Sequence, residues 1–190
     1  MKILHYLLGF PPHRSGGLTK YAFDLMVEQM NLGHDVVALY PGNFSFVTRV
    51  CRFRQVKTYC GIPTYCLTNA LPVPLMYGIS SPNAFISPRR IDGFSDFVEK
   101  VRPDIFHIHT LMGLPKELLL MMKERGIRIV YTSHDYFGLC PRVNFINSDG
   151  NVCEKRNEEN CRECGQHGRG CLFLKLRNAE WVVLLKKLLK

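Results

Sequence analysis

The chain has 190 residues, a length that suits one well-cored domain and is marginal for two. Apolar residues make up 46% of the chain, which excludes a disordered protein, and the formal net charge at pH 7 is +9. Lysines and arginines are scattered, with clusters at 49–57 and 175–190, whereas nucleic-acid readers concentrate charge on one element. Scattered charge fits an anionic small molecule or an anionic membrane surface at least as well.

The N-terminal apolar run is too short, and is broken too soon by Pro11 and Pro12, to be a signal peptide. No stretch approaches the ~20 apolar residues that cross a bilayer. We therefore expect a cytoplasmic protein whose eight cysteines stay reduced.

Strand and helix patterns alternate along the chain. Apolar runs predict strands at 3–8, 35–40, 104–109 and 127–132, and helices at 91–101 and 115–125. A further helix is expected after Ser15, as its cap, and before Gly33, as its stop. Its predicted apolar face consists of Leu18, Tyr21, Ala22, Leu25 and Leu32.

This alternation predicts an α/β fold, a Rossmann-like doubly wound domain with a mostly parallel sheet. Residues 43–90 are rich in proline and are predicted to form a loop-rich insertion. We expect a Rossmann-like acceptor domain at 1–139, a Cys-rich insertion at 140–171 and a basic amphipathic helix at 172–190.

Gly16 and Gly17 stand where the first loop meets its helix. Glycine lets a ligand approach the backbone, and a helix N-terminus offers N–H groups and the positive end of the dipole. A diphosphate or an acceptor hydroxyl fits there, although a Gly-Gly pair alone is also typical of a plain tight turn.

Three histidines fall at the carboxyl ends of predicted parallel strands, where open α/β sheets bind their ligands. His107 and His109 share one face of a strand because side chains alternate. We interpret His107 as a hydrogen-bonded core residue and His109 as a binding residue. His134 is a candidate general base or ligand for a substrate hydroxyl, with Asp135 as a neighbouring substrate-binding residue.

Four short motifs occur in order: Pro11-Pro12-x-x-Ser15-Gly16-Gly17, Leu32-Gly33-His34-Asp35-Val36, Arg102-Pro103-Asp104-Ile105-x-His107-x-His109 and Tyr131-Thr132-x-His134-Asp135-Tyr136. Together they resemble the N-terminal domain of family 4 retaining glycosyltransferases, in particular the capsule and polysaccharide type. The resemblance runs from about residue 1 to residue 164 and is weakest at 43–90.

The resemblance implies two facing Rossmann-like domains, of which the N-terminal one binds the acceptor and the C-terminal one binds the nucleotide-sugar. It places Gly16 and Gly17 against the donor phosphates or the acceptor. It places His109 and His134 on the acceptor side, with His134 near the transferring sugar carbon. It also implies no cofactor for catalysis. Since no donor-domain sequence is recognisable after Cys171, we expect this chain to be inactive alone.

Five of the eight cysteines lie at 140–171, a segment with little periodic apolar content. A Cys-x-x-Cys pair places two thiolates around one tetrahedral metal, and two nearby ligands complete it. We expect Cys140, Cys153, Cys161 and Cys164 to bind a structural Zn²⁺, with Cys171 or His167 as substitutes. An iron–sulfur cluster and disulfides are the alternatives for this set.

Residues 172–190 combine leucines and one tryptophan with five basic residues. Such a helix can lie in an anionic membrane interface, or it can pack on the sheet or on a second domain.

Three classes of function follow. The first is the acceptor-binding half of a glycosyltransferase, with a nucleotide-sugar donor domain or subunit and a sugar or lipid-linked acceptor as partners. The second is a non-catalytic subunit that recruits an acceptor for a separate donor chain. The third is a zinc-stapled nucleic-acid binder, which we disfavour because the sequence lacks a readable aromatic and basic stacking surface.

Overall fold

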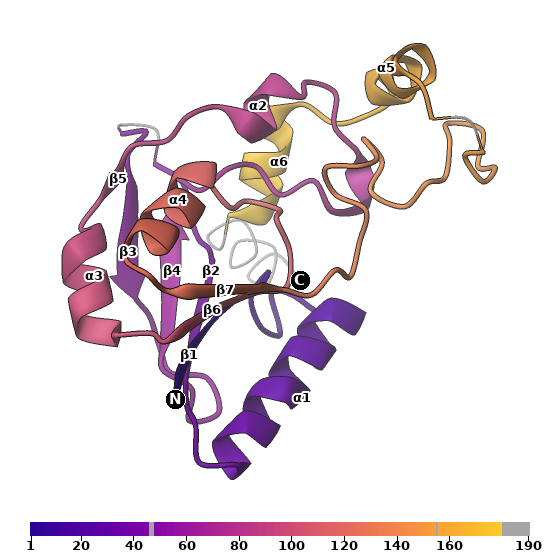
Figure 1. Ribbon diagram of the computed structural model, residues 1–190. Coiled ribbons are helices and arrows are strands. Elements are labelled where there is room, and N and C mark those ends of the chain that lie inside the picture. The colour runs from indigo at the N-terminus through magenta and orange to yellow at the C-terminus, as the bar shows by residue number, and fades with distance from the viewer. Residues whose placement is uncertain (46–47, 155, 180–190) are drawn as a thin grey trace, which may run out of the picture.

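The computed structural model describes residues 1–45, 48–154 and 156–179 (Figure 1). Within these ranges one sheet of seven strands runs in the order β5-β3-β4-β2-β1-β6-β7. The strands are β1 (Lys2–Tyr6), β2 (Asp35–Pro41), β3 (Cys51–Gln55), β4 (Thr64–Thr68), β5 (Ile91–Asp92), β6 (Ile105–Ile108) and β7 (Arg128–Tyr131). The helices are α1 (Gly17–Asn31), α2 (Asn83–Ile86), α3 (Phe94–Val101), α4 (Lys116–Glu124), α5 (Glu158–Gln166) and α6 (Cys171–Asn178), with a short 3₁₀ turn at Leu75–Tyr77.

The sheet is mostly parallel, which confirms the predicted α/β, Rossmann-like class. β1 lies between β2 and β6 and is parallel to both, whereas β3 is antiparallel to β4. The run β4-β2-β1-β6-β7 therefore brings the carboxyl ends of five parallel strands to one edge. Ligands of open α/β sheets bind at such an edge.

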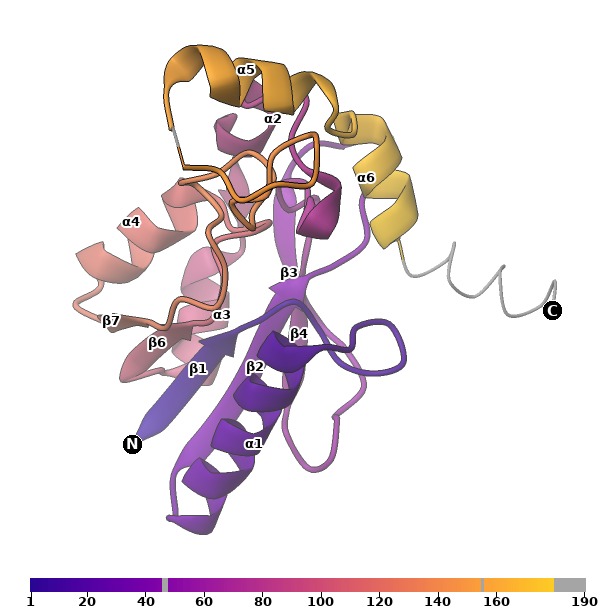
Figure 2. The ribbon, with the colours of Figure 1, turned by 90° about the vertical axis from the view of Figure 1, so that its right-hand side faces the viewer.

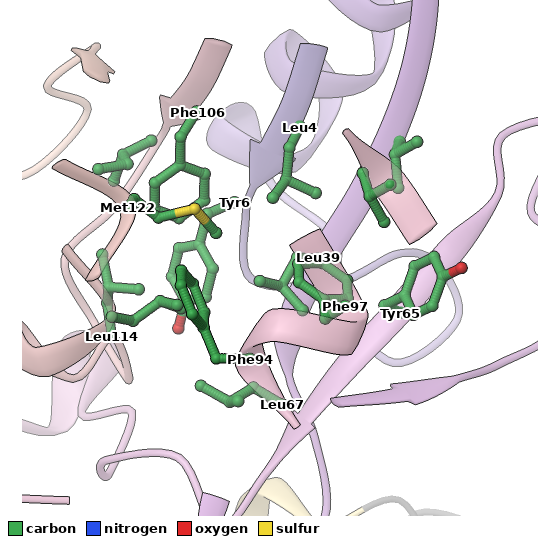
Figure 3. Close-up of a cluster of buried hydrophobic side chains, with 14 of the residues drawn as sticks. Leu4, Tyr6, Leu39, Tyr65, Leu67, Phe94, Phe97, Phe106, Leu114 and Met122 are labelled. Carbon is green, nitrogen blue, oxygen red and sulfur yellow. The ribbon is translucent and has the colours of Figure 1, made fainter. Parts of the chain in front are cut away.

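Alternating side chains along the strands build two different layers. Leu4, Tyr6 and Phe106 face α3 and α4 in the larger apolar core (Figure 3). Val36 and Ala38 of β2 pack instead in a second cluster with Ala22 and Met26 of α1, which lies along β2 on the opposite side of the sheet (Figure 2). Each central strand is thus covered on both faces, which is why it reads as a short continuous apolar run.

Helix α1 differs from its prediction at its start and on its buried face. The N-cap is Gly16, with φ 125° and ψ 175° and no side-chain cap, so the expected Ser15 cap is wrong. Tyr21 and Leu32 are exposed, and the buried positions are Thr19, Ala22 and Met26. The predicted stop at Gly33 is confirmed by its positive φ of 81°.

Residues 43–90 are not simply a loop-rich insertion, because they supply β3 and β4 to the main sheet. In strand β3, Cys51 is buried and Phe53 is half-buried, and the Phe53 ring stacks on Phe97 of α3 at 4.0 Å between centroids. The predicted helix at 91–101 also divides into β5 and α3, since Gly93 adopts a left-handed conformation between them.

The C-terminal part of the described chain forms α5 and α6, which lie in the upper part of Figure 1, with α6 next to α2. Helix α6 buries Leu174 completely against Ile79 and Phe85, which confirms a helix at the start of 172–190. The helix ends at Asn178, because Ala179 is extended, so the expected helix is not continuous from 172 onward. Residues 180–190 of the prediction lie outside the described residues. Each helix in the described part of the chain falls short of the length and apolar character needed to cross a membrane.

Candidate functional site

Four histidines gather at the carboxyl edge of β1, β6 and β7. His5 and His107 are register partners on adjacent parallel strands, and His109 follows two residues after His107. All three side chains therefore lie on the α1 face of the sheet. They are buried, and His134, from the loop after β7, reaches the same cluster.

The imidazoles form a hydrogen-bonded chain. His5 Nε2 lies 2.7 Å from Oε1 of Gln29 on α1, and His5 Nδ1 lies 2.9 Å from His109 Nε2. His109 Nδ1 lies 3.4 Å from His134 Nε2, which is the longest link. The chain thus runs from α1, through the buried layer under it, to the loop that carries His134.

His107 is held separately. Its Nε2 lies 2.8 Å from the hydroxyl of Thr132, and its ring stacks on His109 with 4.3 Å between centroids. The prediction that His107 is a hydrogen-bonded core histidine is confirmed. The stack also helps to fix the plane of the His109 ring between His5 and His134.

Burial keeps the cluster uncharged. Desolvation, followed by the nearby His107, lowers the pKa of His5 to about 4, against a smaller opposite effect of the Gln29 hydrogen bond. Desolvation and the three neighbouring imidazoles lower the pKa of His109 to about 2. The pKa values of His107 and His134 are also lowered, mainly by desolvation. All four rings are therefore neutral at pH 7.

Tyr21 forms a wall of the site. The sequence analysis placed this residue on the buried apolar face of α1, whereas the structure leaves it exposed. Its ring meets His134 edge-on at 4.7 Å and His109 at 6.1 Å between centroids. Tyr21 lies one turn after Gly17, so the start of α1 is close to His134. His5 and Gln29 were also missed. His5 sits in the first apolar strand, and this break in an otherwise apolar run was the available signal.

Asp135 does not form a pair with His134. Its Oδ1 accepts a hydrogen bond from the Phe137 amide at 2.9 Å, and its Oδ2 accepts one from the Thr110 hydroxyl at 3.3 Å. These bonds fix the loop after β7 to the loop after β6. The carboxylate still opposes part of the desolvation effect on the pKa of His134.

Open space lies beside both glycines at the start of α1. A Cβ atom placed on Gly16 or Gly17 would meet no atom within 4 Å. Gly16 is required by its backbone conformation rather than by crowding, whereas Gly17 has an ordinary φ. The first turn of α1 carries no acidic residue, and the free N–H groups of a helix N-terminus favour an anion.

Two sets of side chains in the described residues resemble metal ligands. Ligand nitrogens of His5, His107 and His109 lie within 4.8 Å of one another. Cys140, Cys153, Cys161 and Cys164 instead line one small cavity of about 20 Å³. Such a cavity holds about one water or ion. Their sulfurs do not reach the spacing of the histidine set, so the cysteine site stays a prediction.

All eight cysteines are free thiols in the structure, so none of the expected disulfide alternatives is formed. Cys161 lies on α5, where Cys164 follows at the i+3 spacing that puts both on one face. Burial, and then the neighbouring thiols Cys153 and Cys140, raise the pKa of Cys161. His167 and Cys171, the expected substitutes, are not among the residues that line this cavity.

A doubly wound sheet that gathers polar side chains at the carboxyl ends of its parallel strands defines a Rossmann-like domain. A family model described as Glycosyltransferase Family 4 matches residues 15–153, and the chain belongs to this family. The match includes Gly16, Gly17, His109, His134 and Asp135. Searches of curated proteins and of solved structures found no significant match. The family indicates a glycosyltransferase-like function.

Proposed function

We propose that this chain is the acceptor-binding half of a retaining glycosyltransferase that works in polysaccharide or glycolipid synthesis. The observation that carries the proposal is the contact of His134 with Tyr21, because it joins the ends of the parallel strands to the start of α1. One surface thereby combines a neutral imidazole, an aromatic ring and helix N–H groups. Sugars bind to such combinations of hydrogen-bonding groups and aromatic faces.

In the proposed reaction, the bond between the anomeric carbon and the diphosphate oxygen breaks and a bond to the acceptor oxygen forms. Before the reaction the acceptor hydroxyl donates its hydrogen bond to His134, and as the new bond forms its proton passes to the released diphosphate. His134 binds that hydroxyl, and the N–H groups after Gly16 and Gly17 stabilise negative charge on the donor side. His109 acts through His134, since its own ring is fully buried. Asp135 shapes the loop that carries His134.

The nucleotide-sugar is contributed by a donor domain or subunit, as the family pattern implies. A non-catalytic acceptor-recruiting subunit, which serves a separate donor chain, uses the same surface and is the second candidate. We place the protein at the cytoplasmic side, where nucleotide-sugars are made, with a membrane surface as a partner when the acceptor is lipid-linked.

We also propose that the four cysteines at 140–164 hold a structural Zn²⁺. Supporting this, residues from two loops and one helix bring four thiols to one cavity of ion size. Closing the sulfurs on an ion requires a shift of the loops, since thiolate–zinc distances are about 2.3 Å. This metal has no step in the reaction; it would hold the segment that carries α5.

The functional proposal is tested by titrating the isotope-labelled full chain with a panel of oligosaccharide glycosides and, separately, with nucleotide-sugars. We expect saturable amide shifts at Gly16, Gly17 and His134 with at least one glycoside, and no sugar transfer by the chain alone. Transfer that is restored by a second chain would favour the recruiting subunit. Sugar transfer by the purified chain, or glycoside binding away from these residues, would overturn the proposal.

A further inference from the structure

The buried imidazoles differ from ordinary core residues because their hydrogen bonds have a direction. A neutral imidazole carries one N–H group and one lone pair, so it donates at one nitrogen and accepts at the other. His5 and His109 each use both nitrogens in the chain. The proton on one ring therefore decides where the proton lies on the next.

The direction begins at α1. The Oε1 atom of Gln29 can only accept, so His5 donates from Nε2 and offers its lone pair at Nδ1. His109 then donates from Nε2 to His5 and offers its own lone pair at Nδ1. His134 in turn donates from Nε2 to His109, which leaves its lone pair at Nδ1.

We propose that Gln29, His5 and His109 are positioning residues that set the tautomer of His134. They hold its proton at Nε2, so that Nδ1 accepts a hydrogen bond from the hydroxyl group of a ligand. The tautomer inference stands on these contacts alone; its use for an acceptor hydroxyl rests on the proposed function. The opposite tautomer would instead donate an N–H to the hydroxyl oxygen and could no longer accept the hydroxyl proton.

Three features stabilise this series of hydrogen-bonded imidazoles. His5 and His109 are 0% exposed, so water does not compete for their nitrogens. The low pKa values of both rings keep them neutral, as a directional chain requires. The ring of His107 stacks on His109 while its Nε2 is engaged by Thr132, so it supports the chain without being a link.

The close spacing of three histidines also fits a metal ion, but the hydrogen bonds favour a directly hydrogen-bonded series of imidazoles. An ion between His5 and His109 would need to separate nitrogens that lie 2.9 Å apart in a hydrogen bond. It would also remove the N–H that His109 donates from Nε2 to His5. The two readings give opposite results when Zn²⁺ is added.

The experiment is long-range ¹H–¹⁵N spectroscopy of the full chain labelled at histidine, without any sugar. We expect His5, His109 and His134 each to be neutral at pH 7 with the proton at Nε2. Gln29→Leu removes the acceptor that starts the chain, so the Nδ1 signal of His134 should move toward the shift of a protonated nitrogen. Gln29→Glu keeps an acceptor oxygen and should leave that signal in place.

His5→Phe removes the hydrogen bonds to Gln29 and to His109, and it should produce the same shift at His134 as Gln29→Leu. Thr132→Val, which removes the partner of His107, serves as the control outside the chain. If His5→Phe fails to fold, the Gln29 pair decides, because that residue lies on the partly exposed surface of α1.

An unchanged His134 spectrum in both Gln29→Leu and His5→Phe would overturn the proposal. Loss of the imidazole pattern on adding Zn²⁺ in excess of the amount that the four cysteines bind would also overturn it, in favour of a metal site at the histidines. Neither result depends on sugar binding, so failure of this proposal is distinguishable from failure of the proposed function.

Discussion

The histidine cluster and the cysteine-rich segment both gather reactive side chains, but by different means. The histidines are placed by parallel strands whose register is fixed over several residues, and their rings are buried and hydrogen-bonded. The cysteines lie in loops and on the short helix α5, held mainly by local bonds such as those of the Asn147 side chain to nearby amides.

The cysteine-rich segment meets the rest of the chain at both of its ends. Near the first end, Val143 packs in a buried cluster with Leu8 and Met112, and near the second end Gly168 lies against Ile79. A Cβ atom on Gly168 would lie 2.5 Å from the carbonyl carbon of Ile79, and Arg169 forms a bridge with the same residue. The histidines, in contrast, are positioned by strand pairing, so their arrangement needs no bound ion. The cysteine site needs a further constraint between its loops, and a bound ion would supply one.

The largest expected effect comes from removing metal. We expect about one zinc per chain, and its removal by a chelator should lower the melting temperature, since zinc contributes on the order of 10 kcal/mol to small metal-folded units. The measurements are elemental analysis and thermal unfolding of the full chain. Cys161→Ser should abolish the zinc, whereas Cys60→Ser, at an exposed position outside the cavity, should retain it. Less than about 0.2 zinc per unchelated chain would rule the metal out.

The second-largest expected effect is a loss of folding stability in acid, because the buried histidines are neutral in the folded protein. The folded pKa values of His5 and His109, about 4 and about 2, lie below the unfolded value of 6.5. The unfolded chain therefore takes up protons first, and stability falls as the pH drops below about 6.5, by up to roughly 1.4 kcal/mol per pH unit for each group.

The measurement is the urea midpoint between pH 7 and pH 5. His109→Gln should flatten the pH dependence, whereas His13→Gln, on an exposed loop, should leave it as it is. A midpoint that does not change over this range would contradict the buried neutral cluster.

A smaller loss is expected for Gly16→Ala. The backbone at this N-cap, φ 125° and ψ 175°, is open to glycine and strained for any other residue, at a cost of about 1–3 kcal/mol. Chemical unfolding should show a reduced midpoint with an unchanged slope. Equal stability of Gly16→Ala and the native chain would mean that the loop before α1 adapts to a side chain.

The smallest effect on stability is expected for Gly17→Ala. Its side chain would enter open space at the first helical position, where alanine is favoured over glycine by up to about 1 kcal/mol. The variant should fold at least as well as the native protein but bind a glycoside or phosphate ligand more weakly. Unchanged binding would place the ligand elsewhere than the start of α1, and the measurement is the same titration with both proteins.

Local patterns were enough for most of the α/β frame. The apolar runs of β1, β2, β6 and β7, the stop at Gly33 and the shared face of His107 and His109 all follow from periods of two and 3.6 residues. The strands β3 and β4 were missed because they lie in a proline-rich segment and because β3, with its two arginines, has no continuous apolar run. Pairing with each other and with β2, rather than propensity, makes them strands.

By itself, the sequence determined the fold class, the family and the residues at the strand ends. Only the tertiary structure decided how they act together. His5 contacts His109, which lies 104 residues away in the sequence. Helix α1 buries Ala22 and Met26, and this orientation brings Tyr21 and Gln29 to the histidines. Which face a helix buries depends on the sheet beneath it, and a hydrogen bond between distant residues leaves no periodic trace in the chain.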